Sequence, residues 1–524
     1  MKQLSILAAA LAIAAGQTYI GRVDTIGGTT YDWWANANVH RSLVNSPQFG
    51  THAAWMYSTS FSGTDFPDRN MRYSFYDYST RQWNWPDPDY MQSGVNVFAE
   101  RTGYGVLDAD SAGRASVAAN SGSGLVIARD AGSGAGIFDY SDTLSGYYWP
   151  DMVIGDDGTY HVAMASLDYV LSYGRIRPGH DWDSIRLLDS TASPAYGIAS
   201  GKTAPSVCVV RGDNTSAFFT LSESRGDTWS SQTWLDPPPA FGGDTVTRFS
   251  RFGLFPFFDS QGRLHIAAAV YPEVHDTAYV NPAEIWHWCP ENQPVWSEIH
   301  HAGCAPEHLQ GSPGSGATYA DRPSMGEGND GRLLVAWEQF DSTNVETTTN
   351  RLRAGVWISG SADNGMTWAP GSLVTERNTI SHRFPCIIDR MVGSPSDDTI
   401  CVLYMMDQVA GFFVMGEGPA TPDPVICQFI PSPLDAAAET PSIQVPSIYK
   451  MTTIVRGVLM MGQRLTDDGP GSVLADATGR KVLELRSGAN DVRALAPGVY
   501  FCRLTAGSAS CARRSAVTKI VIQK

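Results

Sequence analysis

The chain has 524 residues, which leaves room for one large domain and one small domain. Only 17% of the residues are charged, whereas 51 Gly, 15 Trp and 21 Tyr are present, a balance typical of turn-rich, all-β secreted proteins. The net charge of −16 is uneven, because residues 445–524 hold 12 Lys and Arg against 5 Asp and Glu, and the rest holds 25 against 48. An acidic body argues against nucleic acid as a partner, since phosphate binding needs a basic face.

The N-terminus has the pattern of a secretory signal peptide. Met1-Lys2 is positive, Leu4 to Ala15 is a short apolar run, and two small-x-small cleavage sites lie near Ala12. We expect residues 1–16 to be a signal peptide. No later segment reaches the ~20 apolar residues of a membrane-spanning helix, so no transmembrane span is expected.

The body contains seven segments that each predict a strand, a turn and a second strand. They begin at Arg41, Arg101, Trp149, Pro205, Arg251, Arg322 and Arg383, at intervals of 46 to 71 residues. This spacing leaves room for two further strands in each unit. Repeats of this kind are typical of β-propeller blades. The sequence therefore predicts an all-β fold, with a six- or seven-bladed β-propeller over residues 17–430.

A second pattern, S-x-D-x-G-x-T-W, falls between these units. One copy is complete: Ser361, Asp363, Gly365, Thr367 and Trp368. Another has Ser224 in the Asp place: Ser222, Gly226, Thr228 and Trp229. Both resemble the Asp-boxes, or BNR repeats, of sialidase-like propellers. Their Asp and Ser side chains are expected to bind turn amides while Trp packs between sheets, which is a structural role away from the active site.

The eight cysteines suit an oxidising compartment, and three disulfides are predicted: Cys289–Cys304, Cys386–Cys401 and Cys502–Cys511. Cys208 and Cys427 are not assigned to a disulfide. A His- and Cys-rich stretch between His287 and His308 has ligand types that zinc accepts, but its spacing matches no familiar finger, and a disulfide would account for its thiols. No metal and no cofactor are expected, and no glycine-rich phosphate loop is present.

A Pro/Ala-rich linker is expected over residues 431–447, because its Thr-Pro and Val-Pro steps favour extended backbone. The remaining residues, 448–524, predict a small immunoglobulin-like β-sandwich with turn signals at Thr478-Gly479 and Pro497-Gly498. This region contains a D-x-x-G-R-x-V segment, an L-x-P-G-V-Y-F segment and a basic final strand. The residues that carry the pattern are Asp476, Gly479, Arg480, Pro497, Gly498 and Tyr500.

In this order, these features resemble the C-terminal sorting domain of the type IX secretion system of Gram-negative bacteria. The resemblance implies that the secretion machinery is a partner and that the protein is secreted or held at the outer-membrane cell surface. An ordinary C-terminal carbohydrate-binding or immunoglobulin-like module is the alternative.

In a propeller, the first strand of each blade lines the central channel, and its start lies on the same face as the end of the second strand. Five first strands begin with arginine: Arg41, Arg101, Arg251, Arg322 and Arg383. Acids follow several second strands: Asp168, Glu223, Glu273, Glu338 and Asp407. The pattern predicts a channel mouth ringed by arginines that bind a carboxylate or phosphate. Pairing of each arginine with a neighbouring acid, to fix blade junctions, is the alternative.

Sialidases combine an arginine triad with a Tyr nucleophile, a Glu partner and an Asp acid/base, so the resemblance allows catalysis. Asp65, Glu338 and Tyr404 are weak candidates for these roles, and the early Phe/Tyr-Arg-x-Pro pattern of that family is absent. Three functions remain open: binding of extracellular glycan or protein, sialidase-like hydrolysis of acidic sugars, and a structural envelope or matrix role. Whether the protein is an enzyme is left undecided, with the non-catalytic function preferred.

Overall fold

The computed structural model describes residues 19–34, 41–63, 65–183, 185–190, 195–212, 216–242, 245–393 and 398–432, and, near the C-terminus, 453–455, 458–461, 473–476, 480–485, 488–503 and 517–522. The chain forms two compact units, Met1–Ala437 and Ala438–Lys524. The predicted signal peptide and most of the predicted linker lie outside the described residues. Two short 3-10 helices, η1 (Tyr90–Gln92) and η2 (Pro306–His308), are the only helices among the residues described. None of these residues forms a helix that is long and apolar enough to cross a membrane.

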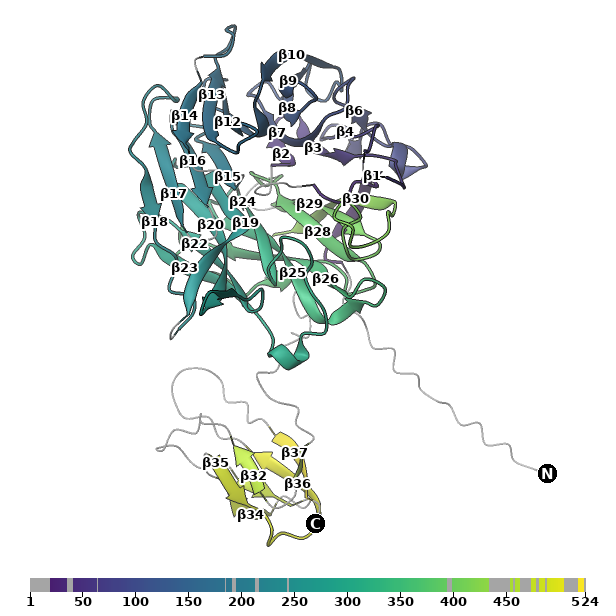
Figure 1. The fold of residues 1–524 in the computed structure, drawn as a ribbon, viewed down its shortest axis with the longest axis vertical. Coiled ribbons are helices and arrows are strands. Elements are labelled where there is room, and N and C mark those ends of the chain that lie inside the picture. Colours follow the sequence, from purple (N-terminus) through teal and green to yellow (C-terminus); the bar gives the residue numbers. More distant parts are fainter. Residues whose placement is uncertain are drawn as a thin grey trace, which may run out of the picture. The chain divides into compact units, whose positions relative to one another are not determined.

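The described part of the first unit contains seven antiparallel sheets arranged around a central axis (Figure 1). The sheets are blades 1 to 7, and the first strands of successive blades contact one another. Blade 1 contains β2 (Leu43–Ser46), β3 (Gly50–Tyr57), β4 (Asn70–Asp77) and β5 (Gln82–Trp83), with β6 (Val95–Asn96) beside β4. Blade 2 contains β7 (Gly103–Ala109), β8 (Ala115–Asn120), β9 (Gly124–Asp130) and β10 (Phe138–Ser145).

The next three blades repeat this meander. Blade 3 contains β11 (Tyr148–Ile154), β12 (Tyr160–Ala165), β13 (Leu171–Ile176) and β14 (Arg186–Asp189). Blade 4 contains β15 (Tyr196–Ser200), β16 (Val207–Gly212), β17 (Ala217–Ser222) and β18 (Thr233–Leu235). Blade 5 contains β19 (Val246–Phe258), β20 (Leu264–Val274), β22 (Ala283–Trp288) and β23 (Trp296–Ala302), with β21 (Thr277–Ala278) paired to β20.

The last two blades complete the ring. Blade 6 contains β24 (Ala320–Glu327), β25 (Leu333–Glu346), β26 (Arg351–Ser361) and β27 (Ser372–Leu373). Blade 7 contains β28 (Ser381–Ile387), β29 (Thr399–Asp407), β30 (Asp423–Pro431) and, as its outer strand, β1 (Arg22–Thr29). The N-terminal strand thus closes the ring by pairing with β30, and the Asn45 N–H of blade 1 donates to Asp389 of blade 7 at 2.9 Å. The unit is a seven-bladed β-propeller.

Burial falls from the inner to the outer strands of a blade. Every residue of β24 and β28 is buried, whereas no residue of β14 or β27 is. Inner strands are covered on both faces by neighbouring blades and therefore read as continuous buried runs. Hydrophobic clusters form where adjacent blades meet, for example Val210 of blade 4 with Ile266 of blade 5. Burial between blades, rather than within one sheet, makes up the core.

Several turns between the first and second strands share one chemistry. Asp110 accepts hydrogen bonds from the N–H and Nε of Arg114, and Asp259 accepts the same two from Arg263. The glycine before each arginine has a positive φ, +72° at Gly113 and +80° at Gly262, which an L-residue adopts at a cost. The D-x-x-G-R pattern is therefore a self-capped hairpin turn.

Each innermost strand begins at one face of the propeller, called the entrance face, and ends at the opposite face. The prediction of seven strand pairs holds for six units. The pair predicted from Pro205 consists of the second and third strands of blade 4, because β15 (Tyr196–Ser200) precedes it as the first strand. The run of β15 is only five residues long, and the pattern took the run from Pro205 that follows it as the first strand. Glu223 therefore follows a third strand and lies at the opposite face.

The described part of the second unit contains two sheets. The larger has the order β31 (Thr453–Val455), β37 (Val517–Ile522), β36 (Gly498–Arg503), β33 (Val473–Ala475), β34 (Lys481–Glu484), and the smaller pairs β32 (Val458–Met461) with β35 (Gly488–Asp491). Asp476 accepts hydrogen bonds from the N–H and Nε of Arg480, as in the propeller turns. Tyr500 is buried, and its hydroxyl donates to the Ala496 carbonyl. Gly479 lies outside the described residues.

Candidate functional site at the entrance face

The innermost strand is bulged near its start in blades 2, 3, 5, 6 and 7, where its register with the second strand shifts. In four of these blades a bulky residue in the bulge has a positive φ: Tyr104, Trp149, Arg322 and Phe384, at 51° to 57°. This backbone is strained for residues other than Gly, and bulges redirect side chains. The entrance face therefore carries aromatic and arginine side chains in positions that a regular strand would not give them.

Arg322 and Arg383, from blades 6 and 7, both bind the carboxylate of Glu338 on β25. Arg322 Nη1 donates to Oε1, Arg383 donates to both oxygens at 3.1 Å, and the Phe384 N–H donates to Oε2 at 3.0 Å. All three charged side chains are at most 2% exposed. Burial raises the pKa of Glu338, but the two guanidiniums outweigh it and hold that pKa at about 2. These two arginines are therefore already paired with the protein's own acid.

An aromatic cap covers this ion cluster. The cap consists of Trp33, Trp34, Phe252, Phe384 and Phe412, with Trp33 4.8 Å from Phe412 and 5.9 Å from Phe252, between ring centres. Arg322 packs its guanidinium against three of these rings, at 4.9 Å from Phe384, 5.0 Å from Phe252 and 5.9 Å from Trp33. Trp33 and Trp34 are 5% and 7% exposed. The cap separates Arg322 and Arg383 from solvent.

Three buried carboxyl groups lie near one another, and two of them, Asp32 and Asp407, interact with Arg383. Burial raises the pKa of Asp32 to about 7, although the N–H groups of Phe413 and Val414 donate to it and Arg383 attracts it. Burial and repulsion between carboxylates raise the pKa values of Asp407 and Asp423 well above the usual range. These groups hold the 407–423 connection against the cap.

Arg41 lies inside the channel rather than at its mouth. Its guanidinium is 6.0 Å from the Phe255 ring centre, and with Asp151 and Ile198 it lines a cavity of only about 10 Å³. A space of this size holds about one water molecule. Burial raises the pKa of Asp151 to about 6, while the Ile198 N–H and the charge of Arg41 oppose the shift. Arg41 therefore helps to fill the channel at mid-depth.

Arg101 remains accessible and lies beside Arg69, a residue that the sequence patterns did not select. Arg101 donates to the carbonyls of Asp65 and Phe66, and Arg69 Nε donates to the Thr102 carbonyl at 3.0 Å. Neither arginine has a carboxylate within 4.0 Å among the described residues. The pKa of Arg101 lies below its usual value, because the group is partly buried and Arg69 adds a second positive charge.

Two tyrosine hydroxyls complete this cluster, which we call the Arg69–Arg101 site. Tyr31 and Tyr104 share a hydrogen bond of 2.6 Å, and Arg69 Nη1 is 3.5 Å from the Tyr31 hydroxyl. The Arg69 guanidinium lies 5.4 and 5.2 Å from the Tyr31 and Tyr104 ring centres. Burial raises the pKa of Tyr104. Tyr104 directly follows the Arg101-Thr102-Gly103 strand start, which was a usable signal, whereas the loop position of Arg69 gave none.

Arg251 is exposed at the start of the blade 5 bulge, 5.7 Å from the Phe252 ring centre. It makes no ion pair with any residue that the structure describes. The five predicted arginines therefore do not form one ring: two are buried on Glu338, one fills the channel, and two are open at different blades.

The three catalytic candidates do not come together. Asp65 is exposed, and its backbone carbonyl rather than its carboxylate binds Arg101. Tyr404 is fully buried, and its hydroxyl donates to Gln428 Oε1 at 3.0 Å. All described contacts of the Glu338 carboxylate are with Arg322, Arg383 and the Phe384 N–H.

Both Asp-boxes follow third strands and so lie at the opposite face. In blade 6, Asp363 accepts from the Thr367 N–H at 2.9 Å, and Ser361 Oγ accepts from the Gly365 N–H at 2.8 Å. The Trp368 ring centre lies 5.3 Å from that of His287 in blade 5. The turn bonds and the inter-blade tryptophan are those that the pattern predicted.

The blade 4 box keeps this geometry with a serine in the Asp place. Ser224 Oγ accepts from the Thr228 N–H at 2.9 Å, and Ser222 Oγ accepts from the Gly226 N–H at 2.8 Å. The Trp229 ring centre lies 4.7 Å from that of Tyr173 in blade 3.

Two of the predicted disulfides are wrong, because the six cysteines whose side chains the structure describes are free thiols. Cys289 and Cys304 lie at opposite ends of the β22–β23 hairpin, whose register pairs Trp288 with Trp296 and Ala283 with Ala302. Cys386 lies opposite Leu403, so Cys401 is only its diagonal neighbour. The Cys502–Cys511 pair lies outside the described side chains. The described residues hold no group of three or more His, Cys, Asp or Glu arranged for a metal ion.

No family model matches this chain, and no curated protein matches it. Among solved structures, it is similar to an ulvan lyase of a polysaccharide lyase family, with a TM-score of 0.47 and 11% identity, over 76% of this chain and 100% of the other. It is also similar to the NanB sialidase of Streptococcus pneumoniae, with a TM-score of 0.39 and 10% identity, over 78% of this chain and 70% of the other. A protein of unknown function from Dyadobacter fermentans gives 0.37 and 12%, over 78% and 98%. With such scores, the propeller assignment rests on the strand order.

Proposed function

We propose that this protein is a secreted or cell-surface β-propeller that binds an acidic polysaccharide at its entrance face, through Arg69 and Arg101. The observation that carries the proposal is a pair of adjacent guanidiniums without a carboxylate partner among the described residues. Two like charges side by side repel each other, and a bound anion relieves that repulsion. Arginine presents a planar fork that fits a carboxylate or sulfate.

The surroundings of the pair support a sugar ligand in particular. The Tyr31–Tyr104 hydroxyl pair can exchange hydrogen bonds with sugar hydroxyls, and the backbone carbonyls that hold Arg69 and Arg101 fix their direction. Exposed or half-buried rings lie further around the same face, where Trp149 stacks on Tyr169 at 4.8 Å between centres. A propeller face with several separated contact points suits an extended polymer better than a small metabolite.

Binding is favoured over sialidase-like hydrolysis by the contacts of the tyrosines. A tyrosine nucleophile needs a carboxylate beside its hydroxyl. The described partners of the Tyr31, Tyr104 and Tyr404 hydroxyls are another tyrosine, Arg69 and Gln428, and burial raises the pKa of Tyr104. Hydrolysis of acidic sugars remains the second function, and a purely structural envelope or matrix role the third.

The same proposal includes export by a type IX-like system through the C-terminal unit. It is supported by the ordered motifs around Asp476, Arg480 and Tyr500, and by the signal-peptide pattern of residues 1–16. Removal of residues 448–524 is expected to leave the protein inside the outer membrane, as measured by surface protease accessibility. Surface display of the truncated protein would contradict this part of the proposal.

The binding proposal is tested by titrating the protein with a uronic-acid polysaccharide and with a neutral polysaccharide of similar length. The double variant R69Q/R101Q should weaken binding of the acidic polymer at least about tenfold, because each charge-assisted hydrogen bond contributes about 1.5–3 kcal/mol. The matched control R81Q/R186Q removes two charges at exposed positions, Arg81 in the β4–β5 turn and Arg186 on the outer strand β14. It should leave binding unchanged.

Equal weakening by both double variants would mean that binding follows net charge rather than this site. Cleavage of either polymer by the wild-type protein, lost in R69Q/R101Q, would turn the site into a catalytic one. Absence of binding by folded protein would favour the structural role.

A further inference from the structure

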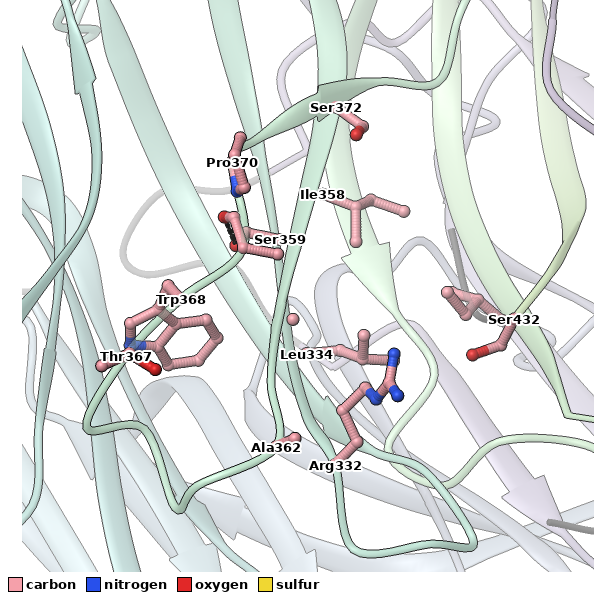
Figure 2. A pocket seen from close by; sticks show the side chains of 13 residues that line it. Arg332, Leu334, Ile358, Ser359, Ala362, Thr367, Trp368, Pro370, Ser372 and Ser432 are labelled. Atoms are coloured by element: carbon pink, nitrogen blue, oxygen red, sulfur yellow. Dashed lines mark hydrogen bonds between the residues drawn. The ribbon is translucent and has the colours of Figure 1, made fainter. Parts of the chain in front are cut away.

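A second cavity, of about 340 Å³, lies at the opposite face between blades 6 and 7. Figure 2 shows Trp368 on one side, Ser432 on the other, and Arg332 between them. Its floor is apolar and consists of Leu334, Ile358 and Ile400. This volume lies at the lower end of the range for ligand pockets and suits one sugar ring.

Three polar side chains of this pocket, those of Arg332, Ser372 and Ser432, are available to a ligand, whereas the Ser359 and Thr367 hydroxyls already bind Ala369 and Asp363. Arg332 makes no side-chain hydrogen bond to any described residue. Its buried Nε has only a long ion pair, at 3.7 Å, with the exposed Asp330. Ser372 begins the outer strand of blade 6, and Ser432 directly follows β30. Neither hydroxyl has a hydrogen-bond partner in the described part of the chain.

The tryptophan wall of the pocket is held rigidly. Trp368 Nε1 donates to Ser297 Oγ of blade 5 at 3.2 Å, and its ring packs edge-to-face on His287. The side chain is nevertheless only half-buried, so part of the indole faces the pocket. A fixed aromatic wall lowers the entropy lost on binding.

Another cavity at this face has a different charge environment. That cavity, of about 300 Å³, lies where the innermost strands of blades 1, 2, 3, 4 and 7 end. Charged side chains of this cavity already form ion pairs. Lys202 pairs with Asp108 at 2.8 Å, Arg390 with Glu327 at 2.9 Å and Asp156 with Arg225 at 2.7 Å. The pocket at Trp368 differs because Arg332 and the hydroxyls of Ser372 and Ser432 make no hydrogen bond to the part of the chain that the structure describes.

We propose that the pocket of Figure 2 binds a single sugar ring that carries a carboxylate, as in a uronic acid. The ring lies beside Trp368, the carboxylate binds the Arg332 guanidinium, and the ring hydroxyls bind Ser372 and Ser432. This site is independent of the Arg69–Arg101 site, because the two lie at opposite faces of the propeller. With both sites occupied, one molecule can connect two polysaccharide chains.

The test titrates D-glucuronic acid and D-glucose into the full chain, by calorimetry or ligand-observed NMR, in the R69Q/R101Q background. This background removes the entrance-face site, so failure of that site and failure of this pocket are distinguishable. We expect glucuronate to bind at least tenfold more tightly than glucose. R332Q should weaken glucuronate binding at least tenfold, R332K by less, and S372A/S432A about threefold to tenfold.

Three results would overturn the proposal: no glucuronate binding at millimolar concentration by folded protein, equal binding of glucose, or no effect of R332Q. Arg332 is partly exposed and weakly paired, so R332Q is expected to fold, which its urea midpoint would check. S372A/S432A changes no charge and so tests the same pocket without altering electrostatics.

Discussion

The Arg322–Glu338–Arg383 cluster predicts a large and pH-dependent loss of stability in Glu338→Gln. The Glu338 carboxylate is fully buried, and its pKa is held at about 2 against an ordinary value of 4.5. That difference corresponds to about 3 kcal/mol, and removal of one partner from a buried ion pair costs about 3–5 kcal/mol. We therefore expect the variant to lose about 3–5 kcal/mol of unfolding free energy at pH 7.

The sign of the pH dependence follows from the lowered pKa. The carboxylate stabilises the fold fully above the unfolded pKa near 4.5, and this contribution is lost as the pH falls toward 2. The difference between wild type and variant should therefore shrink over this range. Urea titrations followed by tryptophan fluorescence at pH 7, 4 and 2.5 measure it.

Glu273→Gln is the matched control. Glu273 also lies on a second strand and pairs with an arginine of the first strand, Arg248, at 2.6 Å, but both side chains are partly exposed. The surface location predicts a much smaller loss. Equal losses in the two variants, or a loss in Glu338→Gln that is the same at pH 2.5 and pH 7, would refute the assignment of Glu338 as a buried structural charge.

Three further predictions concern other parts of the propeller. Because burial raises the pKa of Asp32 to about 7, the unfolding free energy of the wild type should fall as the pH rises from about 4 to 7. Over this range, urea titration should show the unfolding free energy of Asp32→Asn rising by a few kcal/mol relative to the wild type. The same pH dependence in both proteins would contradict this. Ser224→Asp should raise stability by about 0.5–1 kcal/mol, because the two carboxylate oxygens can divide the bonds to the Thr228 N–H and hydroxyl that Ser224 Oγ now shares, as Asp363 does with Thr367. Thermal unfolding would detect the gain, and an unchanged midpoint would contradict it. Thiol titration of the unreduced, urea-unfolded mature protein should find at least the six free cysteines of the propeller, and a count of four or fewer would show that disulfides form.

Much of the fold could be predicted from local chemistry. Turns such as Asp110 to Arg114 carry their own hydrogen-bond partners, so they are visible as a short pattern with strands on either side. The first strand of blade 4, Tyr196–Ser200, is followed by no such turn and was therefore missed. The closing strand Arg22–Thr29 pairs with β30, some 400 residues away, and no local pattern indicates such a pairing.

The candidate site could be predicted only in part. Of the arginines at strand starts, Arg41 lies deeper in the channel than predicted. The partners of the others depend on which blade lies next to them. Glu338 accepts Arg383 from the following blade, and Trp33 reaches across the mouth to Phe252 of blade 5. Arg69 follows a turn in the β3–β4 loop, and only the fold brings it beside Arg101. Such contacts arise from ring closure rather than from spacing along the chain.

The most direct test of the central claim is a crystal structure of the mature protein with a bound uronic-acid oligosaccharide. We predict a sugar carboxylate within hydrogen-bond distance of both Arg69 and Arg101, with a ring hydroxyl at the Tyr31–Tyr104 pair. An oligosaccharide bound elsewhere on the entrance face, with Arg69 and Arg101 unoccupied, would contradict it.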